Sequence, residues 1–107
     1  IIIDATDNIS SRRLIDKYSQ KFKIPMVHGS LYKFEGQVGI FNVNGSVGYS
    51  DIFPNDSTKN QSCQEAGVLG MLPSIIGNIQ ALETIKLIID LKPNLIGRLL
   101  IYDISIL

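Results

Sequence analysis

The sequence has a single cysteine, Cys63, and no tryptophan among its 107 residues. One cysteine excludes a disulfide within the chain and any metal site built from several cysteines. Lysine plus arginine and aspartate plus glutamate both number 10, so no net charge favours nucleic acid or an anionic membrane. No uninterrupted apolar run reaches the ~18 residues of a membrane span, and no secretion signal is recognisable. We therefore expect a cytoplasmic protein with neither nucleic-acid nor membrane partners.

The residues that are present suit one domain with a hydrophobic core. Hydrophobic residues make up 45% of the chain, and a chain of this length buries roughly two thirds of its unfolded surface. The chain opens directly on the apolar run Ile1–Ile3, whereas the ends of natural domains usually lie at the surface. We therefore expect this chain to be a portion of a longer protein.

The first 29 residues have the pattern of a strand, a helix and a second strand. Ile1–Ile3 is apolar throughout, as in a parallel strand buried on both faces, and Asp4–Asn8 would form the turn after it. A helix is expected over residues 11–22 and a short strand over 24–29, which together predict a right-handed crossover. The helix would be capped by one of three polar residues, Asn8, Ser10 or Ser11, and would bury the apolar residues at helical spacing, Leu14, Ile15, Tyr18 and Phe22.

The remaining residues predict a hairpin, a loop, a helix and a last strand. Asn44-Gly45 stands between apolar runs, which is the strongest short signal for a β-hairpin turn. Residues 54–65 are polar and without period, so we expect a surface loop. A helix should begin near Pro73 and end near Asp90, with a wide apolar face and a polar stripe containing Glu83 and Lys86. A strand over residues 98–104 completes a mixed α/β sheet flanked by helices.

Two aspartates at the end of the first strand are the foremost candidates for a functional site. In open α/β sheets ligands bind beyond the carboxyl ends of the strands, which is where Asp4 and Asp7 stand. A carboxylate there could bind Mg²⁺ together with substrate phosphates. Equally, one aspartate could cap the following helix while the other is solvated, and the residues alone leave both interpretations open.

Other polar residues carry weaker signals. Glu35 and Gln37, around Gly36, could line a cleft or belong to an exposed turn. His28, the only histidine, is more typical of a packed strand residue than of a catalytic base. Cys63 lies in a polar loop, where a reactive thiol is possible. The glycine pair Gly67 and Gly70 could form a backbone-binding loop before a helix.

Taken together, several short motifs make the chain resemble the second half of the ThiF/MoeB/HesA family, the bacterial relatives of ubiquitin-activating enzymes. The resemblance covers essentially the whole chain. It rests on motifs that agree in order and spacing, namely DATDN at 4–8, Arg12, PMVHGS at 25–30, FEGQVGIF at 34–41, CQEAGVLGMLPSIIG at 63–77 and IQALETIKLI at 79–88.

The resemblance implies an ATP- and Mg²⁺-dependent adenylyltransferase that activates the C-terminal glycine of a ubiquitin-like sulfur carrier protein, in molybdopterin or thiamine biosynthesis. Asp7 matches the aspartate that acts with Mg²⁺ and the phosphates. Asn8 and Arg12 match residues of the nucleotide pocket, to which we also assign Asp4. Cys63 matches a cysteine that in some members accepts the carrier's acyl group. We expect a homodimer.

Two departures from the family pattern lead to further expectations. The chain has no G-x-G-x-x-G phosphate loop, so residues 1–107 would be the C-terminal portion of the adenylation domain without its nucleotide-binding half, and inactive alone. Gly48 and Asp51 stand where many members have two zinc-binding cysteines. Glycine offers no ligand and one aspartate cannot replace two thiolates at tetrahedral zinc, so we predict no zinc.

Two other functions compete with the adenylyltransferase. A non-catalytic module that binds the carrier protein remains the alternative, and the missing zinc cysteines give it some support. Half of a dinucleotide-dependent oxidoreductase is disfavoured, because the chain has no nicotinamide-binding fingerprint.

Overall fold

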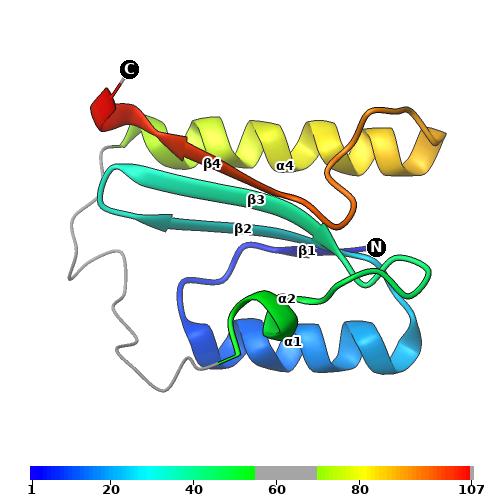
Figure 1. The fold of residues 1–107 in the computed structure, drawn as a ribbon. Coiled ribbons are helices and arrows are strands. Elements are labelled where there is room, and N and C mark those ends of the chain that lie inside the picture. Colours follow the sequence, from blue (N-terminus) through cyan, green and yellow to red (C-terminus); the bar gives the residue numbers. More distant parts are fainter. Residues whose placement is uncertain (55–69, 107) are drawn as a thin grey trace.

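The computed structural model describes residues 1–54 and 70–106, which form a four-stranded sheet in the order β1-β2-β3-β4. β1 pairs with β2 in parallel, and the other neighbours are antiparallel. Figure 1 shows α1 on one side of the sheet, with α2 beside it, and α4 on the other side. The predicted mixed α/β sheet flanked by helices is confirmed. The elements are β1 (Ile2–Asp4), α1 (Ile9–Phe22), β2 (Met26–Tyr32), β3 (Glu35–Phe41), α2 (Tyr49–Ile52), α4 (Met71–Ile89), β4 (Leu99–Asp103) and a 3-10 turn (Ile104–Ile106).

The parallel β1–α1–β2 unit forms as predicted, with Ile2 opposite Met26 in the register. Asn8 is the residue that caps α1, because its side-chain oxygen accepts a hydrogen bond from the Ser11 backbone amide at 2.8 Å. The prediction that the first strand is buried on both faces is wrong. β1 lies at the edge of the sheet, so Ile3 is half exposed, and the strand runs on into Asp4.

The hairpin lies elsewhere than predicted. The antiparallel pair is β2–β3, with Tyr32 opposite Glu35 and a left-handed residue, Lys33, in the turn. Asn44 and Gly45 do form a tight turn, both with positive φ. The chain after this turn enters α2 rather than a strand. Two carboxylates accept hydrogen bonds from backbone amides at the start of α2. Asp51 accepts from the Gly48 amide at 2.8 Å, and Asp16 accepts from the Tyr49 amide at 3.0 Å.

The face that α1 buries is also different from the predicted one. Of the expected core residues only Ile15 packs against a buried cluster, whereas Leu14, Tyr18 and Phe22 are exposed. The helix instead buries three polar residues, each of which has a partner inside the protein. Arg12 bonds Asp4, Asp16 accepts from Asn42 and from α2, and Ser19 donates to the Ile24 carbonyl. Burial of these groups is tolerated because their hydrogen bonds are made.

The second predicted helix is confirmed as α4, which begins at Met71 and ends at Ile89. Its inward side chains include Leu72 and Ile76, which pack on Val38 of β3. The predicted polar stripe is partly wrong. Glu83 pairs with Lys86 at 2.9 Å as expected, yet it is buried and also accepts from the Leu95 amide at 2.7 Å.

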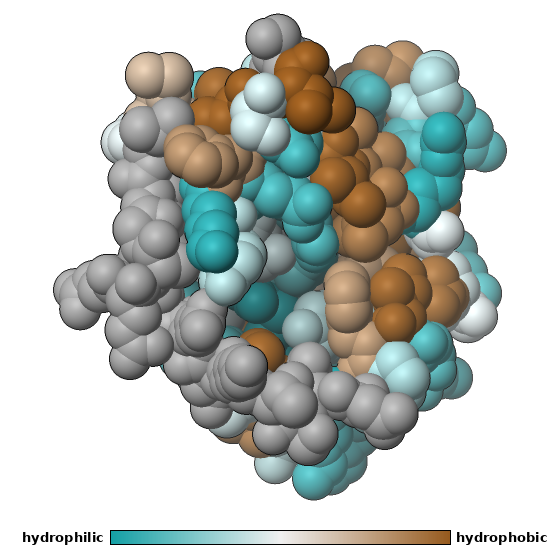
Figure 2. All heavy atoms as spheres, turned by 60° about the vertical axis from the view of Figure 1, so that its left-hand side comes forward, coloured by the Kyte–Doolittle hydropathy of each residue, from teal (hydrophilic) through white to brown (hydrophobic). Residues whose placement is uncertain are grey.

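Much of the predicted apolar face of α4 points outward. Leu82, Ile85 and Ile89 are more than half exposed. The apolar side chains of α4 occupy a wider part of the helix surface than the sheet beneath the helix can cover. By length and composition alone this helix would qualify as a membrane span. Exposed hydrophobic side chains also occur on β1 and α1, for example Ile3 and Phe22. Figure 2 shows one face of the molecule, with a band of hydrophobic residues beside a hydrophilic region.

Candidate functional site

An ion pair between Asp4 and Arg12 lies at the centre of the candidate site. β1 ends at Asp4, whose side chain is fully buried, and the first turn of α1 brings Arg12 against it. The Arg12 Nε donates to Asp4 Oδ2 at 2.7 Å, and its Nη2 donates to the Thr6 carbonyl at 2.7 Å. Thr6 donates to the other carboxylate oxygen from its amide and its hydroxyl, at 3.0 and 2.6 Å. The carboxylate thus fixes both the turn after β1 and the guanidinium.

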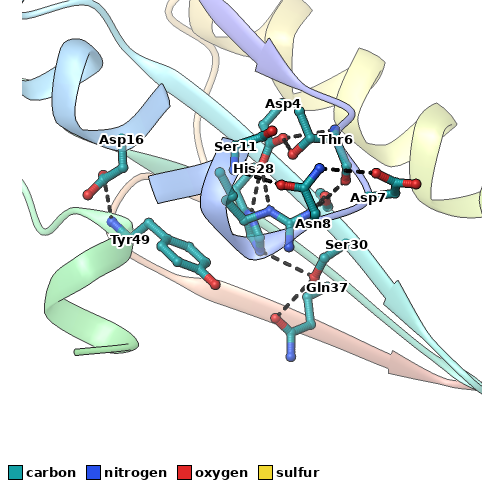
Figure 3. Close-up of polar contacts among 12 residues, drawn as sticks. Asp4, Thr6, Asp7, Asn8, Ser11, Asp16, His28, Ser30, Gln37 and Tyr49 are labelled. Atoms are coloured by element: carbon teal, nitrogen blue, oxygen red, sulfur yellow. Dashed lines mark hydrogen bonds and ion pairs between the residues drawn. The ribbon is translucent and has the colours of Figure 1, made fainter. Parts of the chain in front are cut away.

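His28 extends this cluster into the sheet. It lies on β2, with no exposed surface, between the rings of Phe41 and Tyr49. Its Nδ1 is 3.4 Å from Asp4 Oδ2, and its Nε2 is 3.5 Å from the hydroxyl of Ser30. Figure 3 shows these residues as a chain that runs from Asp4 through His28 to Ser30 and Gln37. The expectation that His28 is a packed strand residue is confirmed.

The charges of the cluster follow from burial and hydrogen bonding. Burial alone would raise the pKa of the Asp4 carboxyl, but hydrogen bonds from His28 and Thr6 and the charge of Arg12 outweigh it and hold that pKa far below its ordinary value. Burial lowers the pKa of His28, and the hydrogen bond to Asp4 offsets this only in part. At neutral pH the site therefore contains an ionised Asp4, a cationic Arg12 and a neutral His28.

A pocket of about 280 Å³ opens above this cluster. Three segments line it: the turn after β1 with the start of α1, the middle of β2, and the N-terminal half of α4. Gln80 of α4 ties them together, because its amide donates to the backbone carbonyls of Asp4 and Val27 at 2.8 and 3.3 Å. The lining residues are Ala5, Thr6, Asp7, Asn8, Ile9, Arg12, Gly29, Ser30, Leu31, Pro73, Ile76, Gly77 and Gln80.

The structure brings three of the predicted site residues to this pocket. Asp7, Asn8 and Arg12 all line it. Asp7 is exposed and accepts a hydrogen bond from the side-chain Nδ2 of Asn8 at 3.2 Å, and Figure 3 shows it at the margin of the cluster. Asp4, the fourth, lies beneath the pocket, and both of its carboxylate oxygens accept hydrogen bonds within the protein. It would therefore affect a bound ligand only by positioning Arg12.

The other predicted candidates lie elsewhere. Cys63 and Gly67 fall outside the described residues, and Gly70 precedes α4. Glu35 and Gln37 belong to β3 rather than to a turn, and Gln37 donates to Glu35 at 3.2 Å. The Ser30 hydroxyl donates to Gln37 at 3.4 Å, which links this pair to the pocket wall.

The donor set at the pocket fits a magnesium–nucleotide complex better than a metal held by protein alone. Within residues 1–54 and 70–106 no group of three histidine, cysteine, aspartate or glutamate side chains converges. Mg²⁺ commonly takes only one or two carboxylates and fills its remaining positions with water and substrate phosphates. The exposed carboxylate of Asp7 meets that requirement, whereas the bonded Asp4 does not.

Gly48 and Asp51, which the resemblance places where many members have zinc-binding cysteines, have structural roles here. Gly48 lies so close to Asn42 that an added Cβ would come within 2.5 Å of the Asn42 Oδ1. Asp51 closes the first turn of α2 by accepting from the Gly48 amide. The absence of zinc remains a prediction.

The sequence model of the ThiF family matches residues 1–106. The chain belongs to the ThiF family. Similar relatives include the "Adenylyltransferase and sulfurtransferase MOCS3" of Aedes aegypti (42% identical over 105 residues) and the "Probable molybdopterin-synthase adenylyltransferase" of Porphyra purpurea (43% over 106). A "Sulfur carrier protein adenylyltransferase" of Thermus thermophilus is 36% identical over 110 residues. The matches cover 96% of this chain but only 24%, 28% and 41% of these relatives.

In this ThiF-family chain the sequence motifs and the pocket coincide. DATDN contributes the turn after β1 and PMVHGS contributes the wall from β2. The motifs at 63–77 and 79–88 contribute Ile76 and Gln80 of α4. The resemblance inferred from these motifs is thereby confirmed. Sequence reasoning missed the buried links beneath the pocket, made by Thr6, His28 and Gln80. Only the i, i+4 spacing of Arg12 and Asp16 gave a sign of a polar face on α1, and that pattern usually marks a solvated face.

Proposed function

We propose that the protein containing this chain is an ATP-dependent adenylyltransferase that activates the C-terminal glycine of a ubiquitin-like sulfur carrier protein for molybdopterin or thiamine biosynthesis. The observation that carries the proposal is the pocket at the end of β1, where Asp7, Asn8 and Arg12 meet. The names of its relatives, which are adenylyltransferases of molybdopterin synthase or of a sulfur carrier protein, support the same chemistry.

The chemistry requires two anions, a carboxylate and a triphosphate, to meet. Arg12 would offset part of this charge. Its guanidinium is held by Asp4 and by the Thr6 carbonyl at 2.7 Å each, so little reorganisation is needed when the negative charge develops. Because Asp4 already neutralises much of the charge on Arg12, we expect the guanidinium to act mainly as an oriented hydrogen-bond donor.

Asp7 would hold the magnesium ion that accompanies the nucleotide, and the ion would neutralise phosphate charge when bound. Asn8 would keep that carboxylate in place, because its side chain donates to Asp7 while accepting from the start of α1. The tasks of this chain are therefore to orient substrates and to position charge, which are the dominant contributions to such transfers. Residues 1–107 alone should not catalyse the reaction, since they include no glycine-rich phosphate loop.

Carrier–adenylate formation tests the proposal. The protein that contains this chain would be incubated with ATP, Mg²⁺ and a recombinant ubiquitin-like sulfur carrier from the same organism, and the carrier would be weighed by mass spectrometry. We expect a carrier heavier by one adenylyl group. Carrier binding without adenylation would instead favour the non-catalytic module, and neither binding nor adenylation would refute both functions.

A homodimer stays a prediction of the same proposal. The exposed hydrophobic residues of α4, among them Ile85 and Ile88, support it because contiguous apolar surface often marks an interface. Light scattering on the purified protein tests it: a mass of two chains is expected, and a monomer at all concentrations would contradict the prediction.

A further inference from the structure

None of the described residues requires a glycine at position 77, in the interior of α4. Gly77 lies within this helix, where glycine is the least favourable residue after proline. Its φ is not positive, unlike those of Gly45 and Gly97. A Cβ added at Gly77 meets nothing within 4 Å among the described residues.

The other glycines packed against the sheet behave differently. An added Cβ would come within 2.3 Å of the Gln80 side chain at Gly29, within 2.3 Å of the Ile76 side chain at Gly36, and within 2.8 Å of the Arg98 carbonyl at Gly39. At Gly39 the nearest atom belongs to the backbone, whereas at Gly29 and Gly36 a packed side chain would have to move. At Gly77 an alanine would meet none of the described residues and would favour the helix, so no packing within residues 1–54 and 70–106 requires the glycine.

Gly77 lies on the wall of the pocket, next to Pro73 and Gln80 of the same helix. The opposite walls carry the turn from Ala5 to Asn8 and the strand segment from Gly29 to Leu31. A methyl group at Gly77 would project from exposed helix surface into this space. Glycine leaves the helix backbone bare at that point, which permits close approach by another chain.

We propose that Gly77 is a specificity-determining residue, whose bare backbone lets the terminal residues of the carrier protein lie against α4 inside the pocket. The inference rests on the proposed function, which brings a glycine-ended chain to this site. Arg12 and Asp7 line the same pocket as Gly77, and the terminal carboxylate would react beside them. The residues behind that carboxylate then pass Gly77, and any side chain on either partner would compete for the same space.

The test compares Gly77→Ala with Asn78→Ala in the protein that contains this chain. Both changes place the best helix former in α4, but Asn78 is exposed and does not line the pocket. Both variants should raise Tm, by about 2–8 °C. Only Gly77→Ala should raise the KM for a recombinant ubiquitin-like sulfur carrier, by roughly 10-fold or more, with the KM for ATP unchanged.

Three results would overturn the inference. The first is an unchanged KM for the carrier in Gly77→Ala, and the second is a raised KM for ATP alone, which would mean that the nucleotide occupies this wall. The third is a lower Tm, which would reveal a packing reason for the glycine. If the wild-type protein binds the carrier without adenylating it, the proposed function fails. The Kd for the carrier, measured by calorimetry for wild type and Gly77→Ala, then still decides the role of Gly77. If the wild-type protein does neither, both fail.

Discussion

Replacement of Asp4 by asparagine should destabilise the fold far more than its single lost charge suggests. Asn has the shape of Asp and its oxygen can still accept from Thr6, so no cavity forms. Its amide nitrogen, however, would then face the Nε of Arg12 and the Nδ1 of His28, which lie 2.7 and 3.4 Å from the carboxylate oxygen that it replaces. The Arg12 Nε would lose its acceptor, and this nearly buried guanidinium would lose its counterion.

Breaking one partner of a buried ion pair costs about 3–5 kcal/mol, whereas domains of this size are stable by only about 5–15 kcal/mol. Asp4→Asn should therefore lower the free energy of unfolding by about 3–5 kcal/mol. The measurement is urea unfolding followed by circular dichroism, with the same denaturant slope m fitted to both proteins. The matched control is Asp7→Asn, three residues away and exposed, which should change stability by no more than about 0.5 kcal/mol. A cost below about 1 kcal/mol for Asp4→Asn would refute the reasoning.

Two further predictions concern His28 and Cys63. Because burial lowers the pKa of His28 in the folded state, the unfolded chain binds its proton at a higher pH. The contribution of His28 to the free energy of unfolding should be fully present above about pH 6.5 and should decrease below that pH, by at most ~1.4 kcal/mol per pH unit. His28→Gln should flatten this pH dependence between pH 7 and 5. An unchanged slope would contradict the conclusion that His28 is buried in its neutral form. Cys63→Ser should leave adenylation intact and abolish any covalent carrier–enzyme adduct seen by mass spectrometry, while a wild-type protein without such an adduct would make Cys63 a bystander.

Local signals in the sequence predicted the parts of the fold that depend on local interactions. The α1 cap, predicted at Asn8, Ser10 or Ser11, is Asn8, and α4 begins within two residues of the predicted Pro73 and ends one residue before Asp90. Both depend on residues within one turn of a helix end. The tight turn at Asn44-Gly45 also formed. What the sequence could not reveal was the path beyond that turn, where the Tyr49 amide donates to the Asp16 carboxylate, 33 residues earlier in the chain.

The choice of buried face on α1 is a second example of a long-range decision. Leu14, Tyr18 and Phe22 have the spacing of a core stripe, and in isolation they would be expected inward. Arg12 and Asp16 are buried instead because Asp4 and Asn42, far away in sequence, provide partners for them. The sequence pattern therefore located the site at the end of β1 but could not assign Asp4 to its buried, supporting position.

ATP–pyrophosphate exchange by an Asp7→Asn variant tests the central claim most directly. The protein that contains this chain would be assayed with ATP, Mg²⁺ and a ubiquitin-like sulfur carrier, beside the control Asp90→Asn, an exposed residue at the end of α4. Loss even of an outer-shell metal partner costs about 10–100-fold, so Asp7→Asn should reduce carrier-dependent exchange by at least that factor while the control retains full activity. Exchange by Asp7→Asn within a few-fold of wild type would contradict the assignment of this pocket as the adenylation site.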